Sequence, residues 1–250
     1  MVSEKNYLSL SGNALKIIAA IAMLIDHAGI LLFPRYPIFR IIGRLAFPIY
    51  AFMIAEGCRY TRNKIRYFLG IFSLAALCQL VYFFYDSSLY MCILVTFSLS
   101  ILMIYALQYF KKCFFDPDKS VIIKILSGLL FLGSVIFTYL LNKVFSIDYG
   151  FWGCMLPVFA SVFHSAGEHY PNFLKKLDII PLHVMALGAG MLIRLMRTSS
   201  PIQVYAFFAL PLLLLYSGKR GRLKMKYFFY IFYPVHLVVL EGIAMLVYYL

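Results

Sequence analysis

The 250-residue chain is 63% hydrophobic and 13% charged, with a mean hydropathy of +0.87. Soluble domains carry roughly 25% charged residues, so the composition excludes a soluble globular protein and indicates a membrane protein. The net charge of +13 does not by itself indicate nucleic-acid binding, because in a membrane protein the placement of charges matters more than their sum. We therefore expect no nucleic-acid partner.

Long apolar stretches predict an all-α fold, a polytopic transmembrane helix bundle of about nine to ten helices that leaves no room for a separate soluble domain. Residues 1–250 are accordingly expected to form one integral-membrane domain. The first residues, MVSEKNYLSLSGN, lack the features of a removable signal, so the first span is expected to be retained. The predicted spans are 13–33, 38–58, 66–85, 89–109, 121–141, 149–163, 179–195, 200–216 and 227–248.

The distribution of Lys and Arg between the connections predicts the orientation. With a cytoplasmic N-terminus, the inner side collects Lys5 and the basic residues of 59–66, 111–124, 175–176 and 219–226. The outer side keeps Arg35, Lys143, Arg194 and Arg197. Because positive residues favour the cytoplasmic side, we expect a multi-pass protein of the cell inner (plasma) membrane. Arg194 and Arg197 either mark an error in the seventh and eighth spans or line a cavity.

The first span carries three ionisable residues, Lys16, Asp26 and His27. Lys16 and His27 are about three turns apart on nearly one face, roughly 16 Å along the helix. Lys16 could simply extend to the inner surface, and Asp26 could form a buried ion pair with Arg40 or Arg44. Ionisable residues deep in a span are otherwise rare, and His is the usual general base near neutral pH.

The second span and the residues that follow it, 40–62, carry Arg40, Arg44, Glu56, Arg59 and Arg62. Charges at bilayer depth cost several kcal/mol unless they are paired or hydrated, so this segment predicts a functional site. Glu56 and Arg59 lie within about a turn of each other and favour an internal ion pair. A proline about a third of the way along, at position 48, predicts a kink there.

The last span contains Tyr233, Pro234, His236 and Glu241, and Tyr233 and His236 share a helix face. His236 either belongs to a site or hydrogen-bonds to a neighbouring helix, with the tyrosines in the interfacial belt.

Other chemistry-bearing residues give weaker signals. The five cysteines have no metal-ligand spacing and are interpreted as buried apolar residues rather than as covalent nucleophiles. His164 and His169 fall in a predicted cytoplasmic loop with Glu168, where we expect a solvated surface rather than a metal site. Asp148 and Tyr149 open the sixth predicted span as a turn and helix cap.

The chain resembles the TraX family, named for the pilin acetylase of conjugative plasmids. The resemblance is carried in order by LKIIAAIAMLIDH, RIIGRLAFPIYAFMIAEGCRYTRN, DYGFWG and SGKRGRLKMKYFFYIFYPVHLVVL. An Asn-x-x-x-Thr that opens the fourth span in that family is here CILVT, so Thr96 is kept and the Asn is replaced by Cys92. This departure puts one polar contact to acceptor or cofactor in doubt.

TraX-like proteins are similar to the acyltransferase family 3 membrane enzymes, which move acetyl groups from cytoplasmic acetyl-CoA to an acceptor on or beyond the membrane. That group has a basic residue, ten others and a His in its first helix, which Lys16 and His27 match. Its Arg-x-x-Arg at a cytoplasmic helix end is matched by Arg59 and Arg62.

The resemblance implies an acetyl-CoA-dependent acetyltransferase with no metal. His27 would be the general base with Asp26, while Arg40 or Arg44 would stabilise the oxyanion or hold Asp26. The remaining assignments concern binding. The cofactor is assigned to Arg59, Arg62, Lys16 and Glu56. The CoA entrance could also include Lys219, Arg220 and Arg222, or these three could bind anionic lipid. The acceptor is assigned to Tyr233, His236, Tyr149 and Thr96.

Expected partners are acetyl-CoA, the lipid bilayer and an acceptor peptide or glycan. The acceptor group, an N-terminal amine or a sugar hydroxyl or amine, stays open, as do acyl length and homo-oligomerisation. A rival hypothesis is a transporter or flippase for an anionic or lipid-linked substrate, although no internal repeat supports it. A non-catalytic assembly protein would leave the buried His27 and Arg44 unexplained.

Overall fold

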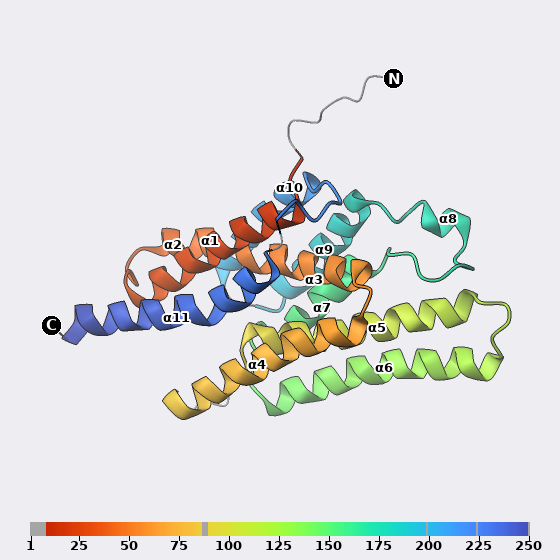
Figure 1. Ribbon diagram of the computed structural model, residues 1–250, viewed down its shortest axis with the longest axis horizontal. Coiled ribbons are helices and arrows are strands. Elements are labelled where there is room, and N and C mark those ends of the chain that lie inside the picture. Colours follow the sequence, from red (N-terminus) through yellow and green to blue (C-terminus); the bar gives the residue numbers. More distant parts are fainter. Residues whose placement is uncertain (1–8, 87–89, 199, 224, 250) are drawn as a thin grey trace, which may run out of the picture. The chain divides into compact units, whose positions relative to one another are not determined.

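The computed structural model describes residues 9–86, 90–198, 200–223 and 225–249, and within these ranges it contains helices and no strand. Figure 1 shows their arrangement. The helices are α1 (Gly12–Leu31), α2 (Pro37–Gly43), α3 (Ala46–Tyr60), α4 (Lys64–Asp86), α5 (Ile93–Phe115), α6 (Val121–Val144), α7 (Gly150–Ser161), α8 (Asn172–Lys175), α9 (Ile180–Leu195), η1 (Pro201–Phe208), α10 (Ala209–Leu214) and α11 (Lys226–Tyr249).

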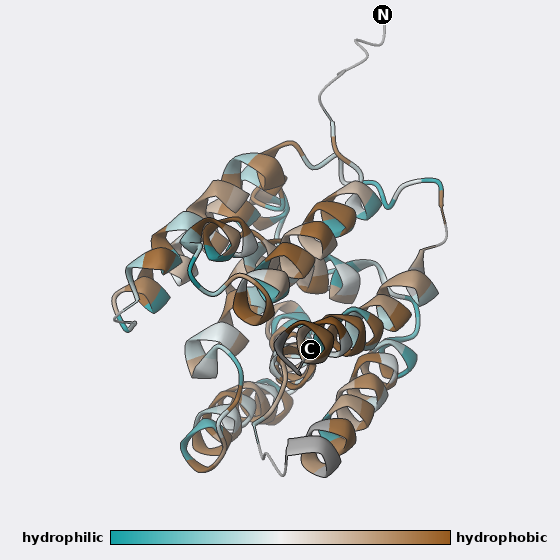
Figure 2. Cartoon of the chain, turned by 90° about the vertical axis from the view of Figure 1, so that its left-hand side faces the viewer, coloured by the Kyte–Doolittle hydropathy of each residue, from teal (hydrophilic) through white to brown (hydrophobic). Residues whose placement is uncertain are grey.

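The all-α membrane fold predicted from the composition is confirmed. Six helical segments of the described chain are long and apolar enough to cross a membrane, and three shorter apolar segments occupy Gly150–Ser161, Ile180–Leu195 and Pro201–Leu214. Each coincides with one of the nine predicted spans. The helices are predominantly hydrophobic along their length (Figure 2), and α6 exposes apolar side chains such as Leu126, Leu129 and Phe137. Lys5 and Lys224, used to predict the orientation, lie outside the described residues.

The second predicted span is interrupted, but one turn earlier than expected. Helix α2 ends at Gly43, a turn covers Arg44 and Leu45, and α3 starts at Ala46. Pro48 therefore lies in the first turn of α3, where its missing N–H deprives the helix of no internal bond. The kink predicted at Pro48 is wrong in position, because the proline starts a new helix instead of bending a continuous one.

The chain divides into two compact units. Unit 1 comprises residues 1–53 and 195–250, and unit 2 comprises residues 54–194. In unit 1, α1 packs against α2 and α11, and the three helices lie side by side in Figure 1. The α1–α2 contact is close because both helices present glycine. A Cβ at Gly29 would lie 2.4 Å from Cβ of Phe39, and one at Gly43 would lie 2.3 Å from Cβ of Asp26.

The segment 217–223 of unit 1, called the basic loop below, covers the N-terminal end of α1. The N–H groups of Gly12 and Asn13 donate to the carbonyls of Lys219 and Arg220 at 2.8 and 2.9 Å, and Nδ2 of Asn13 donates to the Leu223 carbonyl at 2.6 Å. The loop carbonyls thus satisfy N–H groups that a helix start otherwise leaves unpaired. Its Lys and Arg side chains are consequently held near Lys16.

In unit 2, α5 packs against α4, α6 and α7. Polar residues of α5 hold the start of α7 through its backbone. Oγ1 of Thr96 donates to the Asp148 carbonyl at 2.6 Å, and Oγ of Ser100 donates to the Cys154 carbonyl at 2.7 Å. These bonds satisfy polar groups inside an apolar interior, where an unpaired group costs several kcal/mol.

Candidate functional site

A buried ion pair joins α1 to the end of α2 in unit 1. Nη2 of Arg44 lies 2.7 Å from both carboxylate oxygens of Asp26, and Nη1 of Arg40 lies 3.0 Å from Oδ2. Nε of Arg44 also donates to the Arg40 carbonyl at 3.1 Å. The close approach at Gly43 brings the carboxylate within reach of both guanidinium groups. Arg44 is buried, whereas 35% of the Arg40 side chain is exposed, so Arg40 keeps surface that a substrate can contact.

His27 and His236 form a hydrogen-bonded pair between α1 and α11. Nδ1 of His27 lies 2.8 Å from Nε2 of His236, and Nδ1 of His236 lies 2.8 Å from the Phe232 carbonyl. A carbonyl only accepts, so Nδ1 of His236 must carry a proton. When both rings are neutral, Nε2 of His236 is then an acceptor, and Nδ1 of His27 must be the donor.

The consequence of this chain of bonds is a defined tautomer for His27. Its Nδ1 is protonated, so its Nε2 carries the free lone pair. Among the described residues none donates a hydrogen bond to that atom. A proton accepted at Nε2 leaves the Nδ1 bond to His236 intact. The arrangement leaves Nε2 of His27 able to accept a proton while its Nδ1 is held by His236.

The neighbours of this pair differ from those expected. Asp26 is engaged by Arg40 and Arg44 and forms no described bond to His27, so the residue that orients His27 is His236. Tyr233 packs against His236 with ring centroids 5.9 Å apart. Of the two interpretations left open for His236, the hydrogen bond to a neighbouring helix is present, to His27 of α1, and a role in the site stays a prediction.

Lys16 lies on the same helix as His27, with Nζ 5.9 Å from the ring centroid of Phe229 in α11. The basic loop that caps α1 lies at this end of the helix, and its Lys219, Arg220 and Arg222 are exposed. Since the loop carbonyls already occupy the first N–H groups of α1, an anion bound here would be held by side chains.

Thr96 and Tyr149 belong to unit 2 and are brought together there by the turn before α7. Thr96 is fully buried, and its hydroxyl donates to the carbonyl of Asp148. Tyr149 has a φ of 62°, in the left-handed backbone region that residues other than glycine rarely adopt. The Arg194 guanidinium lies 4.9 Å from the Tyr149 ring centroid, and both residues were predicted at the outer face. The predicted acceptor contacts thus fall in both units, with Tyr233 and His236 in unit 1.

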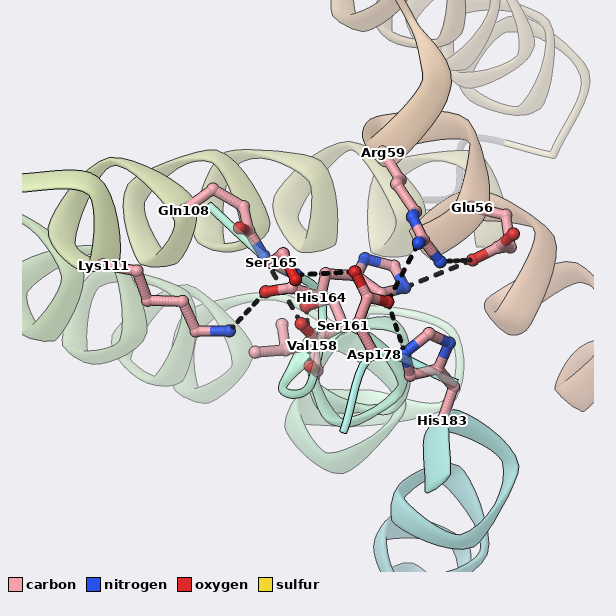
Figure 3. Close-up of polar contacts among 10 residues, drawn as sticks. All are labelled: Glu56, Arg59, Gln108, Lys111, Val158, Ser161, His164, Ser165, Asp178 and His183. Carbon is pink, nitrogen blue, oxygen red and sulfur yellow. Dashed lines mark hydrogen bonds and ion pairs between the residues drawn. The ribbon is translucent and has the colours of Figure 1, made fainter. Parts of the chain in front are cut away.

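A second cluster of ionisable side chains lies inside unit 2 (Figure 3). Nη2 of Arg59 lies 2.9 Å from Oδ1 of Asp178, and its Nη1 lies 3.7 Å from Oε1 of Glu56. The predicted ion pair between Glu56 and Arg59 is therefore present, at 3.7 Å. Nε2 of His164 lies 3.2 Å from Oε1 of Glu56, and Nε2 of His183 lies 3.1 Å from Oδ1 of Asp178.

His164 is a correction to the sequence interpretation. It was expected on a solvated loop surface, but it is buried, whereas His169 is exposed as expected. Nζ of Lys111, in α5, donates to the carbonyls of Val162 and His164, and Nε2 of Gln108 donates to that of Ser161 at 3.4 Å. These bonds from α5 hold the chain after α7 so that His164 is directed inward.

Asp178 and His183 were not singled out from the sequence. The available signal was an ionisable residue in the apolar segment IIPLH next to an Asp, and a His at such a position is rarely left without a partner. Burial raises the pKa of Asp178, but the Ser165 N–H at 3.0 Å and the Arg59 guanidinium outweigh that effect and lower its pKa below the usual value. Asp178 is therefore a stable anion within this cluster.

Arg62 and the cysteines belong neither to the His27–His236 pair nor to the cluster of Figure 3. Arg62 is exposed in the turn between α3 and α4. All five cysteines are buried and form no disulfide, in keeping with their interpretation as apolar residues.

Comparisons with known proteins add a family to this geometry. The family model described as TraX protein matches residues 11–244. A probable fimbrial assembly protein, FimC of serogroup H1, from Dichelobacter nodosus is 28% identical over 244 residues, which cover 90% of this chain and 92% of that one. An uncharacterized protein of Rickettsia prowazekii is 46% identical over 52 residues, 21% of each chain. No solved structure matches.

Proposed function

This chain belongs to the TraX family, and we propose that it is a membrane-embedded acetyltransferase that moves an acetyl group from cytoplasmic acetyl-CoA to an amine or hydroxyl acceptor. The observation that carries the proposal is the run of hydrogen bonds from the Phe232 carbonyl through His236 to His27, which leaves Nε2 of His27 with its lone pair free. A base held in one tautomer inside a membrane protein is what deprotonation of a nucleophile requires.

In the proposed reaction, Nε2 of His27 takes a proton from the acceptor as the acceptor nitrogen or oxygen attacks the thioester carbonyl. The tetrahedral intermediate collapses with loss of the CoA thiolate, and the proton on His27 passes to that sulfur. The products are the acetylated acceptor and CoA. No other reactant is needed, and the base returns to its starting state.

The two arginines beside Asp26 have different parts in this scheme. Arg44 is buried and held at 2.7 Å by both oxygens of Asp26, so we assign it to the support of the site. Arg40 makes a longer bond to Asp26 and keeps part of its side chain exposed. We therefore assign Arg40 to the oxyanion of the intermediate, where one charge-assisted donor contributes about 3–4 kcal/mol.

Binding of the CoA phosphates is assigned to basic side chains at the cytoplasmic side. Within unit 1, Lys16 and the basic loop lie about 16 Å along α1 from His27, a separation that the pantetheine arm can bridge. Arg62 is exposed and free of the cluster in unit 2, in keeping with its proposed role. Arg59, its partner in the Arg-x-x-Arg motif, is engaged by Asp178, and we assign it to the support of that segment.

The acceptor is proposed from the family. One relative is named as a fimbrial assembly protein, and the family takes its name from a pilin acetylase, so the N-terminal amine of a pilin-like peptide is the first acceptor to test. A glycan hydroxyl or amine is the second. The protein would act in the inner membrane, with its N-terminus in the cytoplasm.

The test uses the full chain purified in lipid nanodiscs with acetyl-labelled acetyl-CoA and a set of peptide and glycan acceptors. CoA binding, CoA release and label transfer are followed for the wild type, for His27→Ala and for His169→Ala, which removes an exposed His as a matched control. The proposal expects release to fall at least about 100-fold in His27→Ala and to persist in His169→Ala. Full activity of His27→Ala, or the absence of CoA binding to the wild type, would refute it and favour a transporter.

A further inference from the structure

The cluster of Figure 3 contains more buried ligand atoms than its ion pairs use. We propose that Glu56, His164 and His183 bind one divalent transition-metal ion of the zinc type, with Asp178 as a supporting carboxylate. The three residues come from α3, from the segment after α7 and from α9, and all belong to unit 2. The proposal does not depend on acetyl transfer.

Burial is the first observation that supports a metal. Glu56, His164 and His183 are only 4%, 2% and 0% exposed. Both oxygens of Glu56, Nε2 of His164 and both ring nitrogens of His183 are buried and take part in no hydrogen bond with the part of the chain that the structure describes. A buried polar group without a partner costs about 1–3 kcal/mol, and more when it is charged. One ion could take one nitrogen from each histidine and a carboxylate oxygen from Glu56, and so satisfy several of these atoms together.

The directions of these atoms favour a shared ion over direct bonding. The distances of 3.2 Å from His164 to Glu56 and 3.1 Å from His183 to Asp178 are short enough for hydrogen bonds. They fail as hydrogen bonds nevertheless, because an N–H···O contact also needs an angle well above 120°. Each ring lies near a carboxylate but directs no proton at it. Ligands arranged around one metal ion have this placement.

The spacing suits a small metal ion. One ligand atom from each of Glu56, His164 and His183 lies within 4.8 Å of the other two. A tetrahedral zinc ion with bonds of about 2.0–2.1 Å places its ligand atoms roughly 3.4 Å apart. The observed 3.2 Å between Nε2 of His164 and Oε1 of Glu56 is close to that edge. Two imidazoles and one carboxylate form a donor set that zinc and its neighbours in the first transition row bind well.

Charge and outer contacts complete the argument. Glu56 and Asp178 place two carboxylates beside the guanidinium of Arg59, and a divalent cation would be attracted to them; the nearby ammonium group of Lys111 is directed to the carbonyls of Val162 and His164. Asp178 accepts a hydrogen bond from the Ser165 N–H at 3.0 Å and contacts Arg59 at 2.9 Å. Asp178 is thus a held carboxylate beside His183, 3.1 Å from its Nε2, and such carboxylates are common around metal-binding histidines.

A second set of residues with ligand spacing, Asp116, Asp118 and His169, lies mostly at the surface. Exposed acidic groups of this kind are satisfied by water and support no proposal. His169 is useful as a control, because His169→Ala removes both an exposed His and any metal held by that set.

The experiment measures metal directly on the full chain, purified in detergent without a polyhistidine tag. Samples are stripped with a chelator, incubated with Zn²⁺, Co²⁺ or Mn²⁺ and desalted, and bound metal is measured by plasma mass spectrometry. The wild type and His169→Ala are expected to retain about one Zn²⁺ per chain, and His164→Ala and His183→Ala less than about a fifth of that. Thermal unfolding is followed with and without Zn²⁺, and Zn²⁺ should raise the midpoint only in the first two proteins.

A folding defect in the variants is separated from loss of the site by cobalt on the wild type. Co²⁺ bound by two imidazoles and a carboxylate gives visible absorption bands, which EDTA should abolish and Zn²⁺ should displace. A wild type that retains none of the three metals would overturn the proposal. Equal retention by His164→Ala and His183→Ala, or loss on His169→Ala alone, would overturn it as well. Neither result bears on whether His27 is required for acetyl transfer.

Discussion

The contact between Gly43 and Asp26 makes Gly43→Ala a sharp test of the ion pair beside His27. A Cβ at position 43 would lie 2.1 Å from Oδ1, 2.3 Å from Cβ and 2.4 Å from Cγ of Asp26. Carbon atoms in contact are about 3.5–4.0 Å apart, so the two groups must separate by more than about 1 Å. Because Cβ of Asp26 is fixed to α1, rotation of the side chain cannot relieve the clash. The helices α1 and α2 must move apart.

The expected cost follows from two effects. Forcing an extra carbon into a packed contact costs about 1–3 kcal/mol. Breaking a buried ion pair completely costs about 3–5 kcal/mol, and a separation of this size stretches the 2.7 Å bonds between Asp26 and Arg44 without removing either partner. A total near 3 kcal/mol is therefore expected, which corresponds to a fall of about 6–12 °C in the midpoint of unfolding.

The assay uses the chain's own cysteines. All five are buried thiols that form no disulfide, so a thiol-reactive fluorophore reports unfolding in detergent as they become exposed. Gly242→Ala is the matched control, because position 242 lies in α11 of the same unit and a Cβ there meets no atom of a described residue within 4 Å. That variant should unfold at the wild-type temperature or slightly above it. If Gly43→Ala and Gly242→Ala unfold together, the close packing of Asp26 against α2 does not stabilise the protein and the argument fails.

Three further predictions follow from contacts described above. His236→Ala should lose about tenfold or more in kcat for acetyl transfer. His236→Gln should keep more activity, because an amide oxygen can accept the hydrogen bond from Nδ1 of His27. If kcat falls equally in both variants across the pH–rate profile, His236 is not the acceptor that positions His27. Changing the three basic residues of the basic loop to Gln should raise KM for acetyl-CoA, weaken its dependence on ionic strength and leave kcat unchanged, whereas an unchanged KM would remove the loop from the CoA site. Thr96→Val should lower stability by about 1–3 kcal/mol, because it removes the buried hydrogen bond from Thr96 to the Asp148 carbonyl, and thermal unfolding should show Thr96→Ser close to the wild type.

The membrane helices were predictable because hydropathy over about 20 residues is a local property. The prediction of a span at 121–141 and the helix Val121–Val144 show how little tertiary context such a segment needs. The break in the second span was harder. Pro48 indicated that the helix is interrupted, but the point of interruption depends on how Arg44 and Gly43 meet α1, which no local pattern contains.

The candidate site was only half accessible from the sequence. His27 and His236 could each be singled out as ionisable residues in apolar spans, but their mutual bond, and with it the tautomer of His27, joins positions 209 apart. His164 was misjudged because HSAGEH is a polar string, whereas its burial is decided by α5 and by Glu56. His183 gave too weak a signal, since a single His near the start of an apolar helix has many structural explanations.

The bond between α1 and α11 also has a consequence for how the protein is made. The ribosome delivers His27 early and His236 late, and all of unit 2 is synthesised between the two parts of unit 1. Helix α1, with its basic and acidic side chains, is therefore in the membrane before α11 is synthesised, and the histidine pair forms only when α11 has been inserted. A nascent chain stalled or cleaved before α11 lacks the residue that positions His27, so by the proposed mechanism incomplete copies would release CoA more slowly during biosynthesis.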